Sequence, residues 1–224
     1  MACGFNFQVW RQDRMHHMYQ YEINQLGQAV IFHPGDGSIP VHYNENITEP
    51  QLNQLIFAIN RWNSAVGFEL FSLPEAGTAW RRNTIYISWG HLGESNRGNQ
   101  MYGLCRRYYA TNSLFMRRYI DYASITLWDN LPRRFNHLVL IHELGHALGL
   151  GHDDDIRSIM YPYAAASLGM IQKQDIAFVI SYYQNRASIS YPQNPMEAAS
   201  CEERSCHYPL VTETDEIVYF SEIM

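Results

Sequence analysis

One segment near the start of the chain carries apolar residues at helical spacing: Leu52, Leu55, Ile56, Ile59, Trp62 and Val66. Successive members lie three or four residues apart, so one face of a helix would carry them all. Thr48 stands in the N-cap position, and Gln51 completes a capping box with it. Pro50 suits the first turn and Gly67 suits the end. The pattern predicts an amphipathic helix between Thr48 and Gly67.

Six short runs rich in β-branched and aromatic residues predict strands. They cover residues 29–32, 39–43, 68–71, 84–89, 104–110 and 123–128. A Pro-Gly-Asp-Gly turn separates the first two runs. The predicted helix separates the second run from the third, which is the order of a βαβ unit. Such a unit implies that its two strands pair in parallel.

Two further helices are predicted in the second half of the chain. The first runs from about residue 133 to 148, with Asp129 and Asn130 available as caps. Pro132 suits its first turn. The second runs from about residue 171 to 184 and carries its apolar residues on one side.

The composition is that of a folded globular protein. Of 224 residues, 46% are hydrophobic, 14% aromatic and 17% charged, whereas a disordered chain has fewer aromatic residues. A net charge of −6 and a pI near 5.9 argue against nucleic acid as the main partner. No apolar run approaches the roughly 20 residues of a membrane span.

The pattern divides the chain into three parts. Residues 1–28 show no clear period and predict an N-terminal extension packed on the domain. Residues 29–184 form the domain, and residues 185–224 form a C-terminal tail in which residues 217–220 are strand-like. The N-terminus has no basic or apolar region of the kind that a signal peptide needs. Localisation stays open, with an extracellular or a particle-associated (virion-associated) protein as the options.

Three histidines form the strongest chemical pattern. His142 and His146 are four residues apart on a predicted helix, so both imidazoles lie on one face. Gly149 lies where the helix must stop and turn, and the turn brings His152 back toward them. Three neutral imidazoles leave one position of a tetrahedral zinc ion open, as in catalytic sites. Glu143 is placed to act on a water at that position.

Residues 142–152 read H-E-x-x-H-x-x-G-x-x-H, and a candidate Met-turn at Met160 follows within residues 158–162. This wording resembles the metzincin zinc endopeptidases, and within them most closely the matrixins, the family of the matrix metalloproteinases. Pro162 stands where some metzincins have a tyrosine zinc ligand, so none is expected here. Asp153 departs from the Ser or Thr that is commoner in matrixins.

The resemblance implies an α+β fold: a metzincin-like zinc protease domain with a twisted mixed β-sheet, long helices, a zinc-site helix and a Met-turn. Met160 would pack beneath one catalytic zinc ion without binding it. Residues 90–103 lack the histidine–aspartate wording of the matrixin structural sites, so no second zinc is expected and calcium is left open. By resemblance, residues 104–110 form the edge strand to which an extended peptide substrate adds antiparallel.

The hypothesis that follows is a zinc-dependent endopeptidase acting on a peptide or protein substrate. Zinc would lower the pKa of a water molecule toward about 7, and Glu143 would be the general base. One alternative is a structural or assembly protein, for example virion-associated, that keeps the fold with proteolysis latent or lost. Its terminal segments would then contact a particle partner. The other alternative is a module that binds peptide along the edge strand without cutting it.

Several other residues have two interpretations each. Asp153 would either orient a ligand histidine or lie in a solvated turn. Arg106 and Arg107 would either favour acidic peptides or discourage aggregation at the sheet edge. Cys3 would either block the metal, as a pro-segment cysteine does in matrixins, or be an ordinary buried or free cysteine. The four cysteines do not predict a disulfide framework.

Overall fold

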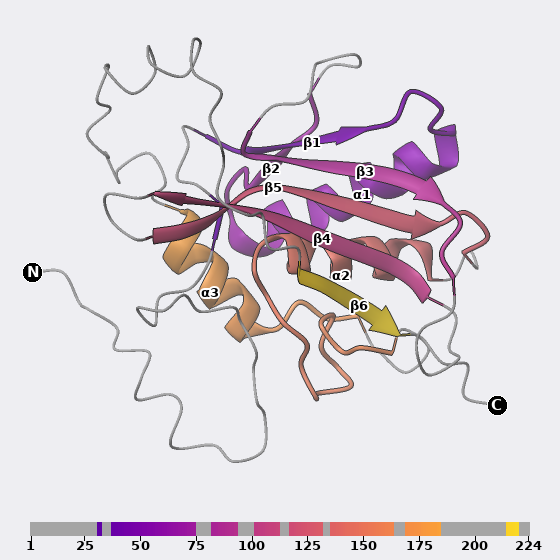
Figure 1. Ribbon diagram of the computed structural model, residues 1–224. Helices are drawn as coiled ribbons and strands as arrows, with labels where there is room; N and C mark the ends of the chain where they lie inside the picture. The colour runs from indigo at the N-terminus through magenta and orange to yellow at the C-terminus, as the bar shows by residue number, and fades with distance from the viewer. Residues whose placement is uncertain are drawn as a thin grey trace, which may run out of the picture.

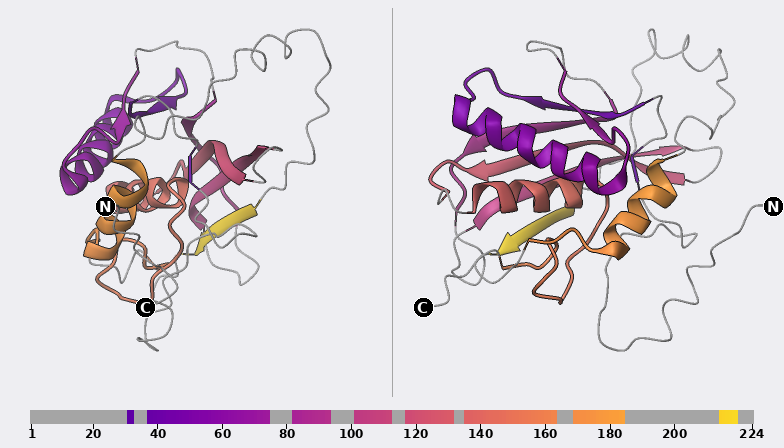
Figure 2. Two further views of the ribbon diagram at one scale, coloured as in Figure 1. Left: turned by 90° about the vertical axis from the view of Figure 1, so that its left-hand side faces the viewer. Right: turned by 180° about the vertical axis from the view of Figure 1, so that it is seen from behind.

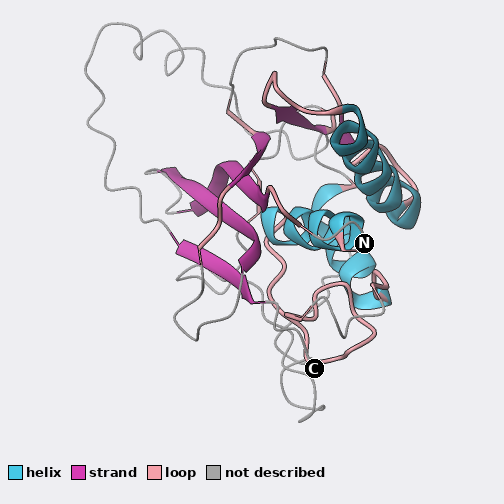
Figure 3. Cartoon of the chain, turned by 90° about the vertical axis from the view of Figure 1, so that its right-hand side faces the viewer, coloured by secondary structure: helices cyan, strands magenta, loops and turns pink. Residues whose placement is uncertain are grey.

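The computed structural model describes residues 31–32, 37–74, 82–93, 101–112, 117–131, 135–163, 169–184 and 214–219. The structure has three helices, α1 (Glu49–Val66), α2 (Asn136–Ala147) and α3 (Lys173–Tyr183). Helices α1 and α2 pack on one face of a mixed sheet, and α3 packs against α1. Seen from behind, α1 and α2 run across the sheet and α3 lies at one end of these two helices (Figures 1 and 2). The sheet and the helices form two layers (Figure 3), which confirms the predicted α+β arrangement.

The sheet has six strands in the order β2-β1-β3-β5-β4-β6. They are β1 (Ile39–Tyr43), β2 (Phe71–Ser72), β3 (Thr84–Gly90), β4 (Met101–Asn112), β5 (Arg117–Trp128) and β6 (Thr214–Tyr219). Strands β2, β1, β3 and β5 are mutually parallel, and β4 is antiparallel to both β5 and β6. The predicted mixed sheet is therefore confirmed, and β1, α1 and β2 form its predicted βαβ opening.

Helix α1 has the start and the end that the sequence predicts. The Thr48 backbone N–H donates to Gln51 Oε1 (2.9 Å), so the capping box is present. Gly67 ends the helix with a left-handed φ of +80°. Fully buried Trp62 donates from Nε1 to the Ile141 carbonyl oxygen at 2.9 Å. This bond ties α1 to the helix that carries the site.

The inner face of the sheet supplies the other half of the core. Ile85 and Ile87 of β3 are fully buried and pair in register with Ala123 and Ile125 of β5. Tyr86, between the two isoleucines, is only half-buried, as the period of two in a strand requires. Burial of each isoleucine stabilises the fold by about 1.5–3 kcal/mol.

Two predicted strands are shorter than expected. In the run 68–71, only Phe71 belongs to a strand. The Asn63 side chain binds the backbone at this point, because its Oδ1 accepts from the N–H groups of Leu70 (3.0 Å) and Phe71 (2.9 Å). In the run 29–32, Phe32 makes an isolated parallel bridge to Ile120. Residues 29 and 30 lie outside the described part of the chain.

The zinc-site helix begins later than predicted. Helix α2 starts at Asn136 with Phe135 as its N-cap residue, and no side chain caps it. Asp129 and Asn130, the predicted caps, lie in a turn instead. Asn130 Nδ2 donates to Asp129 Oδ1 (3.1 Å), and the Asp129 N–H donates to the Gly90 carbonyl (3.0 Å). These groups hold the end of β5 and do not reach the helix.

The prediction that β4 is an edge strand is wrong. Strand β6 pairs with it along Met101–Arg107 and becomes the edge itself. The physical reason is that an open edge presents unpaired N–H and C=O groups, which any extended segment can satisfy. The strand-like run 217–220 lies at the end of that segment, and its prediction as a strand is confirmed for residues 217–219. Phe220 lies outside the described residues.

Other predictions at the ends of the chain lie outside the described residues. These include the extension 1–28 and Cys3, so the domain limits at 29 and 184 stay predictions. Cys105 is described, and it is buried. None of the described helices has the length and apolar character needed to cross a membrane.

Candidate metal centre and active site

Helix α2 fixes two of the three candidate ligands. Every residue from Val139 to Ala147 is buried, so this helix is held on all sides within the fold. His142 and His146 are one turn apart, and their ring centroids lie 4.5 Å from each other in a T-shaped arrangement. Both are almost completely shielded from solvent, with 1% and 0% exposure.

The turn after α2 brings in the third candidate. Gly149 adopts a φ of +97°, and its N–H donates to the His146 carbonyl (2.9 Å). The Leu150 N–H then reaches back to the Gly145 carbonyl (3.1 Å), which closes the helix end. The chain reverses, and the His152 ring centroid comes within 4.8 Å of that of His146. The sequence predicts this turn and its glycine.

Backbone carbonyls set the orientation of two imidazoles. His142 Nδ1 lies 2.6 Å from the Ile159 carbonyl oxygen, and His146 Nδ1 lies 2.8 Å from the Leu150 carbonyl oxygen. A carbonyl only accepts, so each Nδ1 carries the proton and each Nε2 keeps its lone pair. A hydrogen bond from the second ring nitrogen to a carbonyl is the usual support of a histidine that binds a metal.

Burial keeps His142 in the form that binds metal. Its removal from water lowers the pKa of His142 well below the usual 6.5, and the neighbouring His146 and His152 lower it further. His142 is therefore neutral at physiological pH. A zinc ion needs neutral imidazole ligands, so the electrostatics of the cluster suit it.

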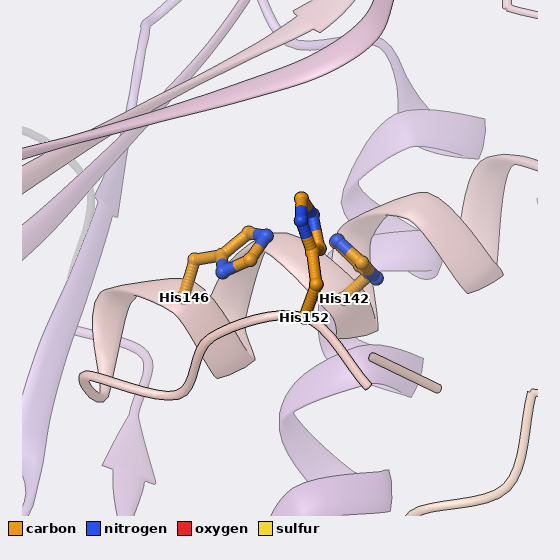
Figure 4. A group of neighbouring side chains, drawn as sticks. All are labelled: His142, His146 and His152. Atoms are coloured by element: carbon orange, nitrogen blue, oxygen red, sulfur yellow. The ribbon is translucent and has the colours of Figure 1, made fainter. Parts of the chain in front are cut away.

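The three histidines fit a single zinc ion. Their ligand atoms all lie within 4.8 Å of one another, and the rings converge on a shared space (Figure 4). Among the described residues, these histidines form the one cluster of three or more potential metal ligands. Most of the 90–103 loop falls outside that part, so the expected lack of a second zinc stays a prediction, and calcium stays open.

Glu143 packs against strand β4 of the sheet. Its side chain is fully buried, and it approaches Gly103 of β4 so closely that a Cβ there would collide with the carboxylate and with Val139. The backbone of β4 thus passes directly over the carboxylate. No local pattern in the sequence predicts this contact, because 40 positions separate the two residues.

Met160 packs under the zinc-site helix. It is fully buried, and a Cβ on Gly145 would collide with its sulfur. The Met160 N–H donates to Ser158 Oγ (3.0 Å), and the Met160 carbonyl accepts from the Asp153 N–H (2.9 Å). The segment is therefore fixed both to the helix and to the chain that follows His152.

Asp153 does not lie in a solvated turn. It is 1% exposed, and its carboxylate accepts from the Asp155 N–H and from Gln174 Nε2, both at 3.0 Å. It links the ligand loop to α3. For His142 and His146, backbone carbonyls rather than this carboxylate fill the orienting role.

Arg107 does not match either interpretation that the sequence suggests. It is 2% exposed and points to the inner face of β4, as Cys105 does two positions before it. Its Nη1 donates to the His146 carbonyl at 3.3 Å. A cation is favourable at the C-terminal end of a helix, where backbone carbonyls accumulate partial negative charge. The alternation with Cys105 is the pattern that could have indicated its burial.

Comparison with known proteins agrees with this geometry. A family profile described as matrixin matches residues 41–184, which include all three histidines. Interstitial collagenase of Oryctolagus cuniculus is 31% identical over 97 residues, 42% of this chain and 21% of that protein. Macrophage metalloelastase of the same species is 32% identical over 91 residues, 38% of this chain and 19% of that protein.

The chain belongs to the matrixin family, because the family profile spans more than half of it. It covers only about a fifth of the length of the collagenase and the metalloelastase that it matches. Among solved structures, the hatching-enzyme zinc protease HCE-1 of Oryzias latipes is 14% identical, with a TM-score of 0.31. That alignment covers 59% of this chain and 49% of HCE-1, a likeness too low to carry an argument.

Proposed function

We propose that the chain is a zinc-dependent endopeptidase that hydrolyses peptide bonds. The observation that carries this proposal is Glu143, a fully buried carboxylate packed against β4 and next in sequence to His142, one of the three clustered histidines. A structural zinc site needs four ligands and no adjacent base, whereas a catalytic site keeps one position open. The matrixin family membership supports the same activity.

Each residue has a distinct role in the proposed reaction. His142, His146 and His152 would hold the zinc ion. When bound, zinc supplies a Lewis acid that polarises the scissile carbonyl and acidifies water. Glu143 takes a proton from the attacking water and later passes it to the leaving amine. Because this carboxylate is enclosed by α2 and β4, its position is fixed before substrate arrives.

Met160 has a supporting role in this proposal. Its sulfur rests against Gly145, between the two helical histidines, and its backbone bonds to the loop of the third. It would act as the packing base of a Met-turn. A thioether is a soft ligand and a poor match for zinc, so Met160 does not complete the coordination.

The test is cleavage of a diverse peptide library by wild-type protein and by Glu143→Gln, with zinc content measured on both. Glu143→Gln keeps the shape of the side chain and removes the base. We expect cuts by wild type alone, at equal zinc content. Equal cleavage by both proteins would refute the role of Glu143.

A measurement of peptide binding on the same two proteins separates the two alternatives. A peptide-binding module would retain zinc and bind peptides saturably without releasing products. A structural or assembly protein would bind zinc and neither bind nor cut peptides. Either outcome would overturn the proposed endopeptidase activity.

A further inference from the structure

From Gly103 to Arg107, strand β4 is paired on both of its edges. A strand in a sheet pairs on two sides only, and β4 pairs with β5 on one side and with β6 on the other. Figure 1 shows β6 as the outermost strand, lying next to β4. Since the pairing of β6 is antiparallel, it uses the same backbone groups that an antiparallel peptide would need.

The paired part of β4 is the part that covers the active site. Gly103, whose missing side chain leaves room for the Glu143 carboxylate, pairs in register with Val218 of β6. Neighbouring strands lie about 4.8 Å apart, so the backbone at Val218 runs one strand spacing from that at Gly103. Strand β6 therefore passes beside the proposed general base.

We propose that β6 is a built-in competitor for the peptide-binding edge of β4. The inference rests on the proposed function, since it takes the substrate to be an extended peptide that pairs with β4. A substrate gains access only in molecules whose β6 has left the edge. The tail thus regulates the site through the fraction of molecules with β6 undocked.

The displacement has a measurable cost. A ligand that binds only the undocked form has its apparent dissociation constant raised by the inverse of the undocked fraction. Because β6 is covalently joined to the domain, it competes at a high effective concentration that does not fall on dilution. Strand β6 is only six residues long, so few ladder hydrogen bonds hold it and its docking is reversible.

The register also indicates which peptides compete best. Asp215 stands opposite Arg106, and Ile217 and Val218 stand opposite Leu104 and Gly103. Opposite charges placed directly across an antiparallel pair stabilise it. The favoured substrate class is an extended peptide with an acidic residue opposite Arg106 and apolar residues toward Gly103.

The first test uses the full chain with Ile217→Pro and Val218→Pro together. Consecutive N–H groups point to opposite sides of a strand, so the pair removes a donor to β4 whichever residue faces it. Hydrogen exchange is measured in the Glu143→Ala background at those amides of Gly103–Arg107 that point toward β6. We expect exchange to rise about tenfold, the change for a β6 docked in about nine molecules of ten.

The matched control is Glu202→Pro with Glu203→Pro, which adds two prolines to the tail outside β6. It should leave the exchange of Gly103–Arg107 as in wild type. Equal exchange in all three proteins would overturn the proposal. A rise of the same size in the control would also overturn it, because the protection would then not depend on β6.

Peptide kinetics complete the test with Glu143 intact. The Ile217→Pro, Val218→Pro chain should show a KM lowered about tenfold and an unchanged kcat. An unchanged KM in an active enzyme would overturn the competition. If neither protein cuts any peptide, the proposed endopeptidase fails, whereas hydrogen exchange still decides whether β6 occupies the edge.

A charge exchange tests the register. Arg106→Asp should speed exchange at Gly103–Arg107, because Asp215 then faces a like charge. Adding Asp215→Arg should restore the protection of the wild type. If the double variant stays as unprotected as the single one while its thermal melt matches wild type, the assigned register is wrong.

Discussion

The guanidinium of Arg107 donates to the backbone carbonyl of His146, with 3.3 Å between Nη1 and the oxygen. One residue lies on the strand that covers the site, and the other is a candidate zinc ligand. The Gly149 N–H donates to the same carbonyl, so this oxygen joins β4, α2 and the turn that leads to His152. Arg107 therefore stabilises the end of the helix at the point where the site is assembled.

Replacement of Arg107 is expected to weaken zinc binding. Arg107→Met keeps most of the buried volume but removes the charged hydrogen bond, at a cost of about 1.5–3 kcal/mol in the free energy of unfolding. We expect a matching rise in the zinc dissociation constant, measured by competition with a chelator. Arg106→Met is the control on the same strand, and it should leave zinc affinity within twofold.

A methyl group at Gly103 is expected to impair the proposed base. In Gly103→Ala the new Cβ would lie 2.8 Å from the Glu143 carboxyl carbon and 2.8 Å from Val139 Cγ1, so these side chains must move. Overpacking of this kind costs about 1–3 kcal/mol. We expect kcat to fall at least tenfold with zinc content unchanged.

Gly93→Ala is the matched control for that prediction, since a Cβ at Gly93 meets nothing within 4 Å. Its kcat should equal that of wild type. If Gly103→Ala kept full activity, the close approach of β4 to Glu143 would have no catalytic consequence.

Removal of the Met160 side chain is expected to destabilise the packing of α2 at Gly145. Met160→Ala leaves a cavity against Gly145 in a fully buried position and should cost about 2–5 kcal/mol. Chemical denaturation measures this cost directly. Met170→Ala provides the comparison, because Met170 is 49% exposed and its loss should change stability by about 0.5 kcal/mol at most.

Acid is expected to destabilise the zinc-free protein through His142. Burial lowers the pKa of His142 in the folded state, whereas the unfolded chain has a pKa of about 6.5. As the pH falls through 6.5, the unfolded state takes up the proton first. The contribution of His142 to the free energy of unfolding is thus fully present above pH 6.5, and it is lost as the pH falls toward the folded-state pKa.

The thermal melting temperature of zinc-free protein between pH 7.5 and 5 measures this effect. His142→Asn keeps a donor near the Ile159 carbonyl and removes the titrating ring, so it should flatten the profile. The same change at His91, an exposed histidine outside the cluster, is the control. A wild-type profile that rises toward acid would contradict the expected sign.

Short-range sequence patterns determined most of the secondary structure and the candidate metal ligands. Helix α1 follows from its apolar spacing, its capping box and Gly67, all within 20 residues. The ligand set follows in the same way, because a helix places His142 and His146 on one face and Gly149 turns the chain toward His152. These are short-range effects of backbone geometry, which the sequence expresses directly.

Only the tertiary structure decided what surrounds those ligands. The burial of Arg107, the contact between Gly103 and Glu143, and the hydrogen bonds of Asp153 each join segments that are distant in sequence. The same holds for β6, whose pairing places Val218 opposite Gly103. Such contacts depend on which strand edges and side-chain faces meet after folding, and no local periodicity specifies them.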